Sequence, residues 1–166
     1  MGRWKNFNLW RGHLPHWRAD DVVYYVTFNS RRPLTDDELK ILYFRLMKLT
    51  SKGFDLIIVC ALPEATEMMF RFPEGGEFSD ALEKTKAKAM REILKKSGER
   101  YPPVSGESYD RIVRDQAEFE ERWETIFESC APIEEETGGD YDWFWCVEDG
   151  SSAFGNTSSE ESSACP

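Results

Sequence analysis

The sequence predicts an α+β domain in which helices pack on one face of an antiparallel sheet. Strand-like and helix-like segments follow one another in the order β-α-β-β-α-(β)-α. The strand-like segments lie too close together for a doubly wound sheet, whose parallel strands each need a long crossover. With 40% hydrophobic and 14% aromatic residues, the 166-residue chain has enough apolar material for one core. Together these observations indicate a ferredoxin-like arrangement.

The first strand and the first helix have clear local signals. Residues 22–28 (VVYYVTF) are β-branched and aromatic, which is typical of a short buried strand. Thr35 and Glu38 then form a capping box, in which two side chains satisfy free amide donors at a helix start. We expect this helix to run to about Ser51, because apolar residues recur at helical spacing and Gly53 ends it.

The middle of the chain predicts a hairpin and a long basic helix. Residues 54–60 and 66–72 are two strand-like runs, and the four-residue break between them favours a hairpin. Residues 78–97 have apolar residues at helical spacing, and Gly98 ends the segment. The outer face of this helix is predicted to carry Lys84, Lys86, Lys88, Arg91, Lys95 and Lys96.

A further strand and a third helix complete the predicted domain. Residues 108–115 (SYDRIVRD) predict a short fourth strand. Asp115 and Glu118 repeat the capping-box pattern and open a helix that we expect to reach about Ser129. Its apolar face is predicted to consist of Phe119, Trp123, Ile126 and Phe127.

Charge is distributed unevenly along the chain, whose formal net charge is -10. Residues 1–116 carry 20 basic and 17 acidic side chains, whereas residues 117–166 carry 1 and 14. The acidic average therefore does not argue against nucleic acid as a partner of the first part. We divide the chain into an N-terminal arm (1–20), an α+β domain (21–146) and a disordered, acidic, serine-rich tail (147–166).

The sequence offers no sign of a membrane segment or of a disulfide framework. No apolar run approaches the roughly 18 residues that span a bilayer, and the first residues do not resemble a signal peptide. We therefore expect a cytoplasmic protein without a membrane partner. The four cysteines form no CxxC pair, so free thiols are expected. They are Cys60, Cys130, Cys146 and Cys165.

Several motifs resemble those of a known family. Residues 11–29 contain arginine-glycine-X-leucine-proline-histidine before the first strand, and residues 108–123 contain tyrosine-aspartate-arginine-X-X-arginine before the last helix. Together with Leu62-Pro63 and the YDWFW segment at 141–145, they resemble the single-tyrosine HUH transposases that process single-stranded DNA. The resemblance is greatest to the branch associated with repetitive extragenic palindromes (REP), and it covers roughly residues 10–146.

The resemblance implies a specific chemistry that this chain lacks the residues to perform. In the family, two histidines hold a divalent metal, Mg or Mn, that polarises a scissile phosphate. A helix tyrosine then attacks the phosphate and forms a covalent 5′-phosphotyrosine. Here the histidine positions fall on Ala65 and Glu67, and the tyrosine position falls on Thr125. We therefore expect a degenerate member with no catalytic residue, no metal site and no cofactor.

Alternative interpretations of the polar residues remain open. Glu67 with Glu64 can in principle ligate a hard cation, but a solvent-facing strand residue is the simpler interpretation. His13 and His16 are interpreted as loop residues or as part of an arm that packs on the sheet or touches DNA. The basic helix face is either a phosphate-binding surface or a solvated face with internal salt bridges. The candidate nucleic-acid-binding residues are Lys84, Lys88, Arg91, Lys95, Arg111, Arg114, Arg11 and His16.

The leading functional hypothesis is a transposase-like protein that has lost strand cleavage and binds single-stranded or hairpin DNA. A protein-interaction module that uses the acidic, aromatic C-terminal surface without nucleic acid is the alternative. A third possibility is a working nuclease whose catalytic residues have moved. The family resemblance also favours a homodimer.

Overall fold

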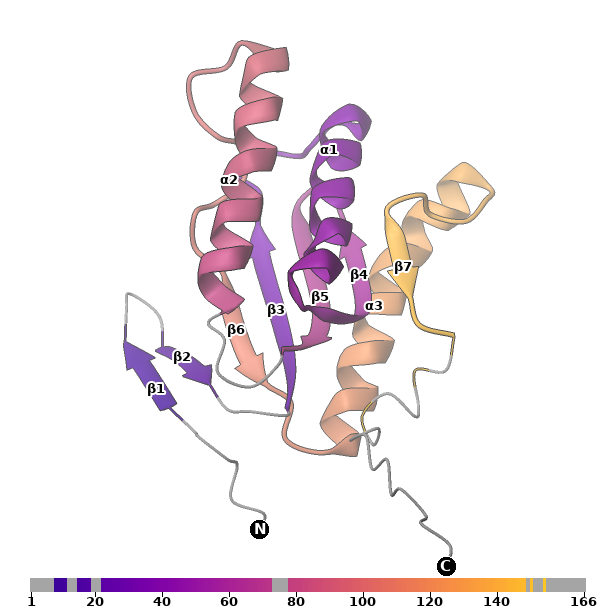
Figure 1. Ribbon diagram of the computed structural model, residues 1–166. Coiled ribbons are helices and arrows are strands. Elements are labelled where there is room, and N and C mark those ends of the chain that lie inside the picture. The colour runs from indigo at the N-terminus through magenta and orange to yellow at the C-terminus, as the bar shows by residue number, and fades with distance from the viewer. Residues whose placement is uncertain are drawn as a thin grey trace, which may run out of the picture.

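The computed structural model describes residues 8–11, 15–18, 22–72, 78–148, 150 and 154, the first two ranges by their backbone only. Figure 1 shows the arrangement of the elements. The strands are β1 (Asn8–Arg11), β2 (Pro15–Arg18), β3 (Val23–Asn29), β4 (Asp55–Ala61), β5 (Ala65–Arg71), β6 (Tyr109–Ile112) and β7 (Phe144–Cys146). The helices are α1 (Asp36–Met47), the 3-10 turn η1 (Lys48–Lys52), α2 (Phe78–Ser97) and α3 (Gln116–Thr137).

Five strands form one antiparallel sheet in the order β6-β3-β5-β4-β7. The first four strands of this sheet in the sequence, β3, β4, β5 and β6, stand in the spatial order fourth, first, third, second. This is the ferredoxin-like arrangement that the sequence predicts, and the α+β class is confirmed. β7 adds a fifth strand beside β4, and β1 and β2 form a separate hairpin, of which β2 contacts β6.

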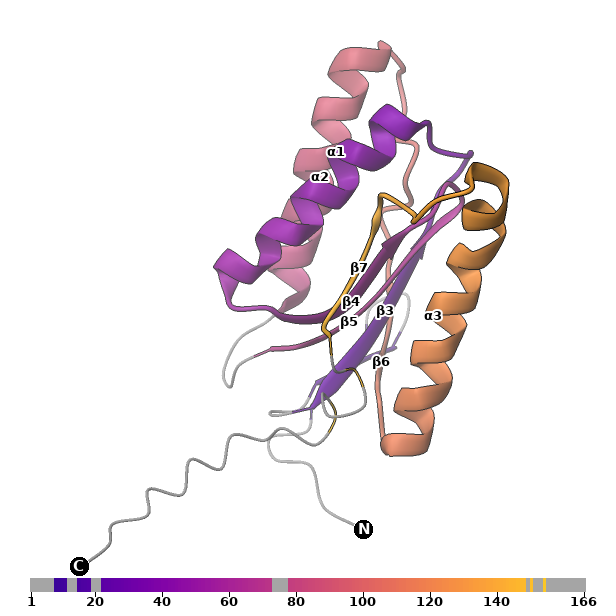
Figure 2. The same cartoon turned by 90° about the vertical axis from the view of Figure 1, so that its right-hand side faces the viewer.

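The three helices do not share one face of the sheet, which corrects the expectation from the sequence. Figure 2 shows α1 and α2 on one side and α3 on the other. The residues of β3 alternate accordingly, since Tyr24 packs toward α1 and α2 while Tyr25 packs in the cluster that includes α3. Residues 56–61 of β4 are buried throughout. A continuous apolar strand of this kind is typical of a sheet covered on both faces.

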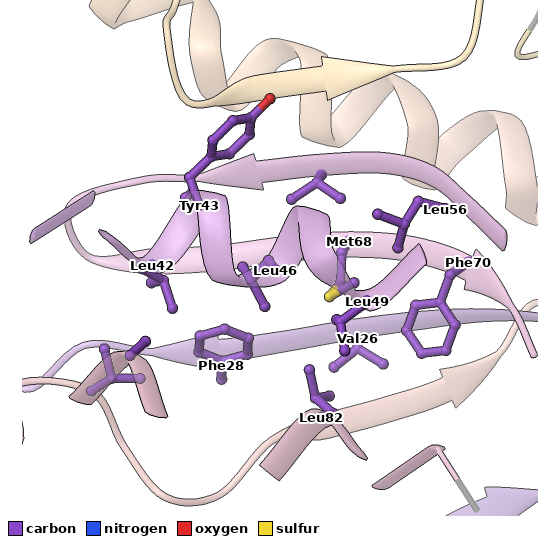
Figure 3. Close-up of a cluster of buried hydrophobic side chains, with 14 of the residues drawn as sticks. Val26, Phe28, Leu42, Tyr43, Leu46, Leu49, Leu56, Met68, Phe70 and Leu82 are labelled. Carbon is purple, nitrogen blue, oxygen red and sulfur yellow. The ribbon is translucent and has the colours of Figure 1, made fainter. Parts of the chain in front are cut away.

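The larger core lies between the sheet and the α1–α2 layer, and the smaller one lies under α3. Figure 3 shows the larger cluster, in which side chains from the sheet meet side chains from the two helices. Its labelled members include Val26, Phe28, Met68 and Phe70 from the strands and Leu42, Leu46 and Leu82 from the helices.

Two of the three helices follow the predicted boundaries closely. The Thr35 amide donates to Glu38 Oε2 (2.9 Å), which confirms the capping box. Gly53 ends the η1 turn with a φ of 88°, a left-handed conformation that glycine adopts without strain. α2 spans the predicted residues 78–97.

The third helix is longer than the sequence predicts. α3 continues past Ser129 to Thr137 and contains Pro132 in its interior. Proline removes one amide donor and leaves the carbonyl four residues earlier, that of Glu128, without its usual partner. Glu128 is exposed, so water can satisfy that carbonyl. The helix ends at Gly138, whose φ is 71°.

Part of the predicted tail packs on the folded body. The Val147 amide donates to the Ile57 carbonyl (2.9 Å), and the Phe154 ring lies 5.6 Å from the Phe119 ring. Both residues belong to the segment that the sequence assigned to a disordered tail, whose remainder lies largely outside the described residues. Within the described part of the chain, no helix is long and apolar enough to cross a membrane.

Candidate nucleic-acid interface

Glu67, at one of the two metal-ligand positions, lies beneath α3 and is half-buried. Its Oε1 accepts a hydrogen bond from the Tyr25 hydroxyl (2.6 Å), and its Oε2 accepts one from Ser129 Oγ (3.2 Å). The simpler expectation of a solvent-facing side chain was therefore wrong. Ala65, the other metal-ligand position, is the first residue of β5 and pairs with Asn29 at the end of β3.

Tyr25 lies beside Glu67, and an arginine lies against the ring of this tyrosine. Burial first, and then the hydrogen bond to Glu67, raise the pKa of the Tyr25 phenol above its ordinary value. The Arg122 guanidinium lies 5.1 Å from the centre of the Tyr25 ring. The Arg122 Nε is buried and has no hydrogen-bond partner among the described residues. This part of the sheet face thus holds a protonated phenol bonded to a carboxylate.

Thr125, at the nucleophile position, points its hydroxyl into its own helix. Thr125 Oγ1 donates to the Glu121 carbonyl (2.8 Å), and Ser129 Oγ reaches the Thr125 carbonyl at 2.8 Å. Glu67 thus contacts α3 at Ser129, one helical turn after Thr125. Across the described residues, no group of three or more histidine, cysteine, aspartate and glutamate side chains gathers to hold a metal.

The other candidate hydroxyls and the thiols have structural partners or remain at the surface. The Tyr141 hydroxyl donates to the Ala61 carbonyl (2.7 Å), as expected for a packed tyrosine with a bonded tip. Tyr109 is 45% exposed on β6. The thiols of Cys60 and Cys130 are buried and share a hydrogen bond with a sulfur–sulfur distance of 2.7 Å. That hydrogen bond, together with burial, raises the pKa of Cys60.

Four of the predicted basic residues form one exposed stripe along α2. Lys84, Lys88, Arg91 and Lys95 are spaced four, three and four residues apart, which places them on one side of a helix. Lys84 is paired with Asp80 one turn earlier (2.6 Å). For the other three, the described residues provide no ion pair. Three of the four residues of the stripe are therefore exposed cations without an ion-pair partner among the described residues.

Lys86 is not part of this surface, which corrects the sequence prediction for the outer face. Only 3% of its surface is exposed. Its Nζ donates to the Gly106 carbonyl (2.9 Å) and to Ser108 Oγ (2.8 Å), and it lies 3.2 Å from Glu83 Oε1. Burial lowers the pKa of Lys86 because it disfavours the charged form. Lys86 therefore ties α2 to the segment that precedes β6.

The two arginines near β6 are both bound to one buried carboxylate. Arg111 Nε lies 2.7 Å from Glu118 Oε1, and Arg114 Nε lies 2.9 Å from Glu118 Oε2. Burial by itself would raise the pKa of Glu118, but the hydrogen bonds and charges of Arg114 and Arg111 outweigh it and lower the pKa. Arg111 and Arg114 are therefore less available to a ligand than the exposed cations of α2. Arg11 and His16 stand on β1 and β2, whose side chains, like all of His13, lie outside the described residues.

The opposite layer of the molecule is acidic. The outer side of α3 exposes a row of glutamates, whereas α2 on the other side of the sheet exposes the basic stripe. The exposed glutamates of α3 are Glu120, Glu121, Glu124, Glu128, Glu135 and Glu136. The charge imbalance seen along the sequence thus becomes a separation between the two faces of the sheet.

No protein-family model matches this sequence, and neither does any curated protein. A similar solved structure is described as a REP-associated tyrosine transposase bound to a REP hairpin. It has a TM-score of 0.58 and 14% sequence identity, and the match covers 74% of this chain and 74% of that one. At this identity the similarity concerns the fold alone. The fold of this chain therefore resembles that of a REP-associated tyrosine transposase, the resemblance that its sequence motifs suggest.

Proposed function

We propose that this protein binds single-stranded or hairpin DNA through the α2 stripe and does not cleave it. The observation that carries the proposal is the row of exposed cations Lys88, Arg91 and Lys95, which have no ion pair among the described residues. Each cation that neutralises a phosphate releases condensed counterions, which favours binding. The similar transposase structure contains a REP hairpin, which supports DNA as the ligand class.

The absence of cleavage is inferred from the face under α3. Phosphoryl transfer in this family needs a metal to neutralise the phosphate and a hydroxyl held in line with it. Glu67 is engaged by Tyr25 and Ser129, and the hydroxyl of Thr125 is bonded to the backbone of its own helix. We expect no covalent protein–DNA adduct on a denaturing gel with Mg or Mn. An adduct that disappears on Tyr25→Phe or Tyr109→Phe substitution would show a relocated nucleophile.

Charge reversal on α2 tests the binding surface. The double variant Lys88→Glu, Lys95→Glu is compared with Lys40→Glu, Lys48→Glu, a matched reversal of two exposed lysines on α1 and η1. Binding of a hairpin oligonucleotide is followed by fluorescence anisotropy at several salt concentrations. We expect the α2 variant to lose binding and, where binding remains, to flatten the salt dependence by about 0.7 per lost contact on a single strand. Equal losses in both variants would contradict the α2 surface.

A protein-interaction module is the second candidate, and one observation favours it. Phe127 on α3 is 42% exposed and contacts Phe144 of β7, although the sequence predicts it on the buried face. It lies within the acidic layer, so its partner would be a protein with a basic, apolar surface. If the wild-type protein binds no hairpin and no single strand even at low salt, this candidate replaces DNA binding.

A further inference from the structure

The loop that follows α2 displays a tyrosine in water. Tyr101 is 64% exposed, more than any other large hydrophobic or aromatic side chain that the structure describes. A ring that is this exposed buries little apolar surface in the core, so it is available to contact a ligand. Figure 1 shows this loop beyond the C-terminal end of α2.

The chain on the N-terminal side of Tyr101 is held by an ion-pair network. Arg32 donates to both carboxylate oxygens of Glu99, at 3.1 and 2.7 Å. The same guanidinium donates to both carboxylate oxygens of Glu38, at 2.8 and 2.7 Å. Glu38 is buried at the start of α1, so the loop is connected through Arg32 to a fixed part of the fold.

The chain on the C-terminal side is held by the end of β3. The Arg31 amide donates to the Pro103 carbonyl (2.6 Å), and the Ser105 amide donates to the Asn29 carbonyl (2.9 Å). Val104 forms an isolated antiparallel bridge with Ser30. Two successive prolines, the second of them buried, further restrict the backbone between Tyr101 and this bridge. Tyr101 therefore lies in a loop whose chain is held on both sides of it.

One cation contacts this ring, and other basic residues stand on the neighbouring segments. The Arg100 guanidinium lies 5.4 Å from the centre of the Tyr101 ring. Lys95 and Lys96 occupy the last turn of α2, and Arg31 is exposed on the segment to which the loop is bonded. The loop between α2 and β6 has two acids, of which Glu99 is paired with Arg32 and Glu107 is exposed six residues after Tyr101. Rings beside cations are how proteins hold unpaired nucleotides, by stacking on the base while cations contact the phosphates.

We propose that Tyr101, with Arg100, is a stacking site for one unpaired base of DNA bound along the α2 stripe. This inference rests on the proposed function. Because the loop is braced before the ligand arrives, little conformational entropy is lost when a base stacks on the ring. A base in a hairpin loop and a base in a single strand that flanks a stem have the same chemistry, so both are tested.

The experiment uses a hairpin with unpaired loop bases and a flanking single strand. Two further probes carry abasic residues, either in the loop or in the flank. Tyr101→Ala is compared with Tyr101→Trp, which keeps a stacking ring, and with Phe44→Ala, a control that removes another exposed ring, on α1. Affinity is measured by anisotropy, and urea unfolding establishes that each variant is folded.

We expect Tyr101→Ala to weaken binding of the intact hairpin by about 5- to 140-fold. The loss should disappear with the abasic probe that lacks the stacked base, and Tyr101→Trp should bind like the wild type. When 2-aminopurine replaces the stacked base, its fluorescence should be quenched by the wild type and not by Tyr101→Ala.

Two results would overturn the inference in different ways. If Tyr101→Ala binds all probes like the wild type while Lys88→Glu, Lys95→Glu does not bind, the stacking site is wrong and the α2 surface stands. The stacking site is also wrong if Tyr101→Ala weakens binding equally on every probe, including the abasic ones. If the wild type binds none of the probes at low salt, the stacking site and the proposed function fail together.

Discussion

Two lysines on α2, only two residues apart, have opposite environments. Lys86 is buried and bonded to Gly106 and Ser108, whereas Lys88 is exposed. Removing a buried donor leaves its acceptors unsatisfied and costs about 1–3 kcal/mol. We therefore expect Lys86→Ala to lower the free energy of unfolding by about that amount, and Lys88→Ala to change it by less than about 0.5 kcal/mol. Urea unfolding of both variants decides the matter, and similar midpoints would contradict the buried role of Lys86.

The stability of the fold depends on pH through the carboxyl group of Glu38. The hydrogen bonds from Arg32 lower the pKa of Glu38, against the opposing effect of burial, and the Thr35 amide lowers it further. A carboxyl group whose pKa is lower in the folded state stabilises the fold at pH values above its unfolded pKa of about 4.3. This contribution is lost as the pH falls through the folded value.

At pH 7 we expect Glu38→Gln to be less stable than the wild type by about 1.5–3 kcal/mol, the range for hydrogen bonds to charged groups. The difference should shrink as the pH falls below about 5, because the wild-type carboxyl then also becomes neutral. Urea midpoints between pH 7 and pH 3 measure this, with the exposed Glu64→Gln as the control. A difference that stays constant over the whole range would show that the charge of Glu38 is not what matters.

At the level of elements, α3 carries a proline in its interior. Pro132 costs the helix one hydrogen bond and crowds the preceding turn, a penalty of about 3 kcal/mol in a regular helix. Because Glu128 and Pro132 are both exposed, the surroundings need not change when the proline is replaced. We expect Pro132→Ala to raise the free energy of unfolding by about 1–3 kcal/mol. An unchanged or lower urea midpoint would show that the turn around Pro132 is distorted for another reason.

The helix ends show which elements the sequence determines locally. The start of α1 at Thr35 and the end of α2 at Gly98 depend on residues within one turn, and both were predicted correctly. The end of α3 was not predicted correctly, because a proline usually stops a helix, whereas α3 continues past Pro132 and ends at Gly138. The capping signal at Asp115 was correct, since its side chain accepts from the Glu118 amide.

Placement across the sheet could be predicted less well. The ferredoxin-like class follows from the order of elements, but β7 was not predicted as a strand. The face that α3 covers depends on the direction in which the chain leaves β6. The buried state of Lys86 depends on Gly106 and Ser108, about twenty residues away. Likewise, the contact of Glu67 with Tyr25 and Ser129 joins three elements, and no local pattern signals it. The environments of the candidate site residues therefore could not be predicted from local sequence, because they depend on contacts between distant elements.

At the scale of the whole molecule, the sheet separates two layers of opposite charge. The α1–α2 layer carries the basic stripe, and the outer face of α3 carries the row of exposed glutamates. A negatively charged ligand is attracted to one side and repelled by the other, so it approaches in a preferred orientation. Salt shortens the range of both effects to about 10 Å at 0.1 M. The proposed DNA ligand therefore approaches the α2 side with the α3 layer pointing away.

The strand order also determines how the backbone opens to solvent. β3 and β5 are paired on both sides, whereas β7 is bonded to β4 alone and over only three residues. In hydrogen–deuterium exchange, we expect the amides of β3 and β5 to exchange only when the whole domain unfolds, and those of β7 to exchange much faster through local opening. Equal protection of β7 and β5 would contradict this. A strand that opens by itself exposes the backbone edge of β4 for short periods, and that edge can then pair with a strand of another chain.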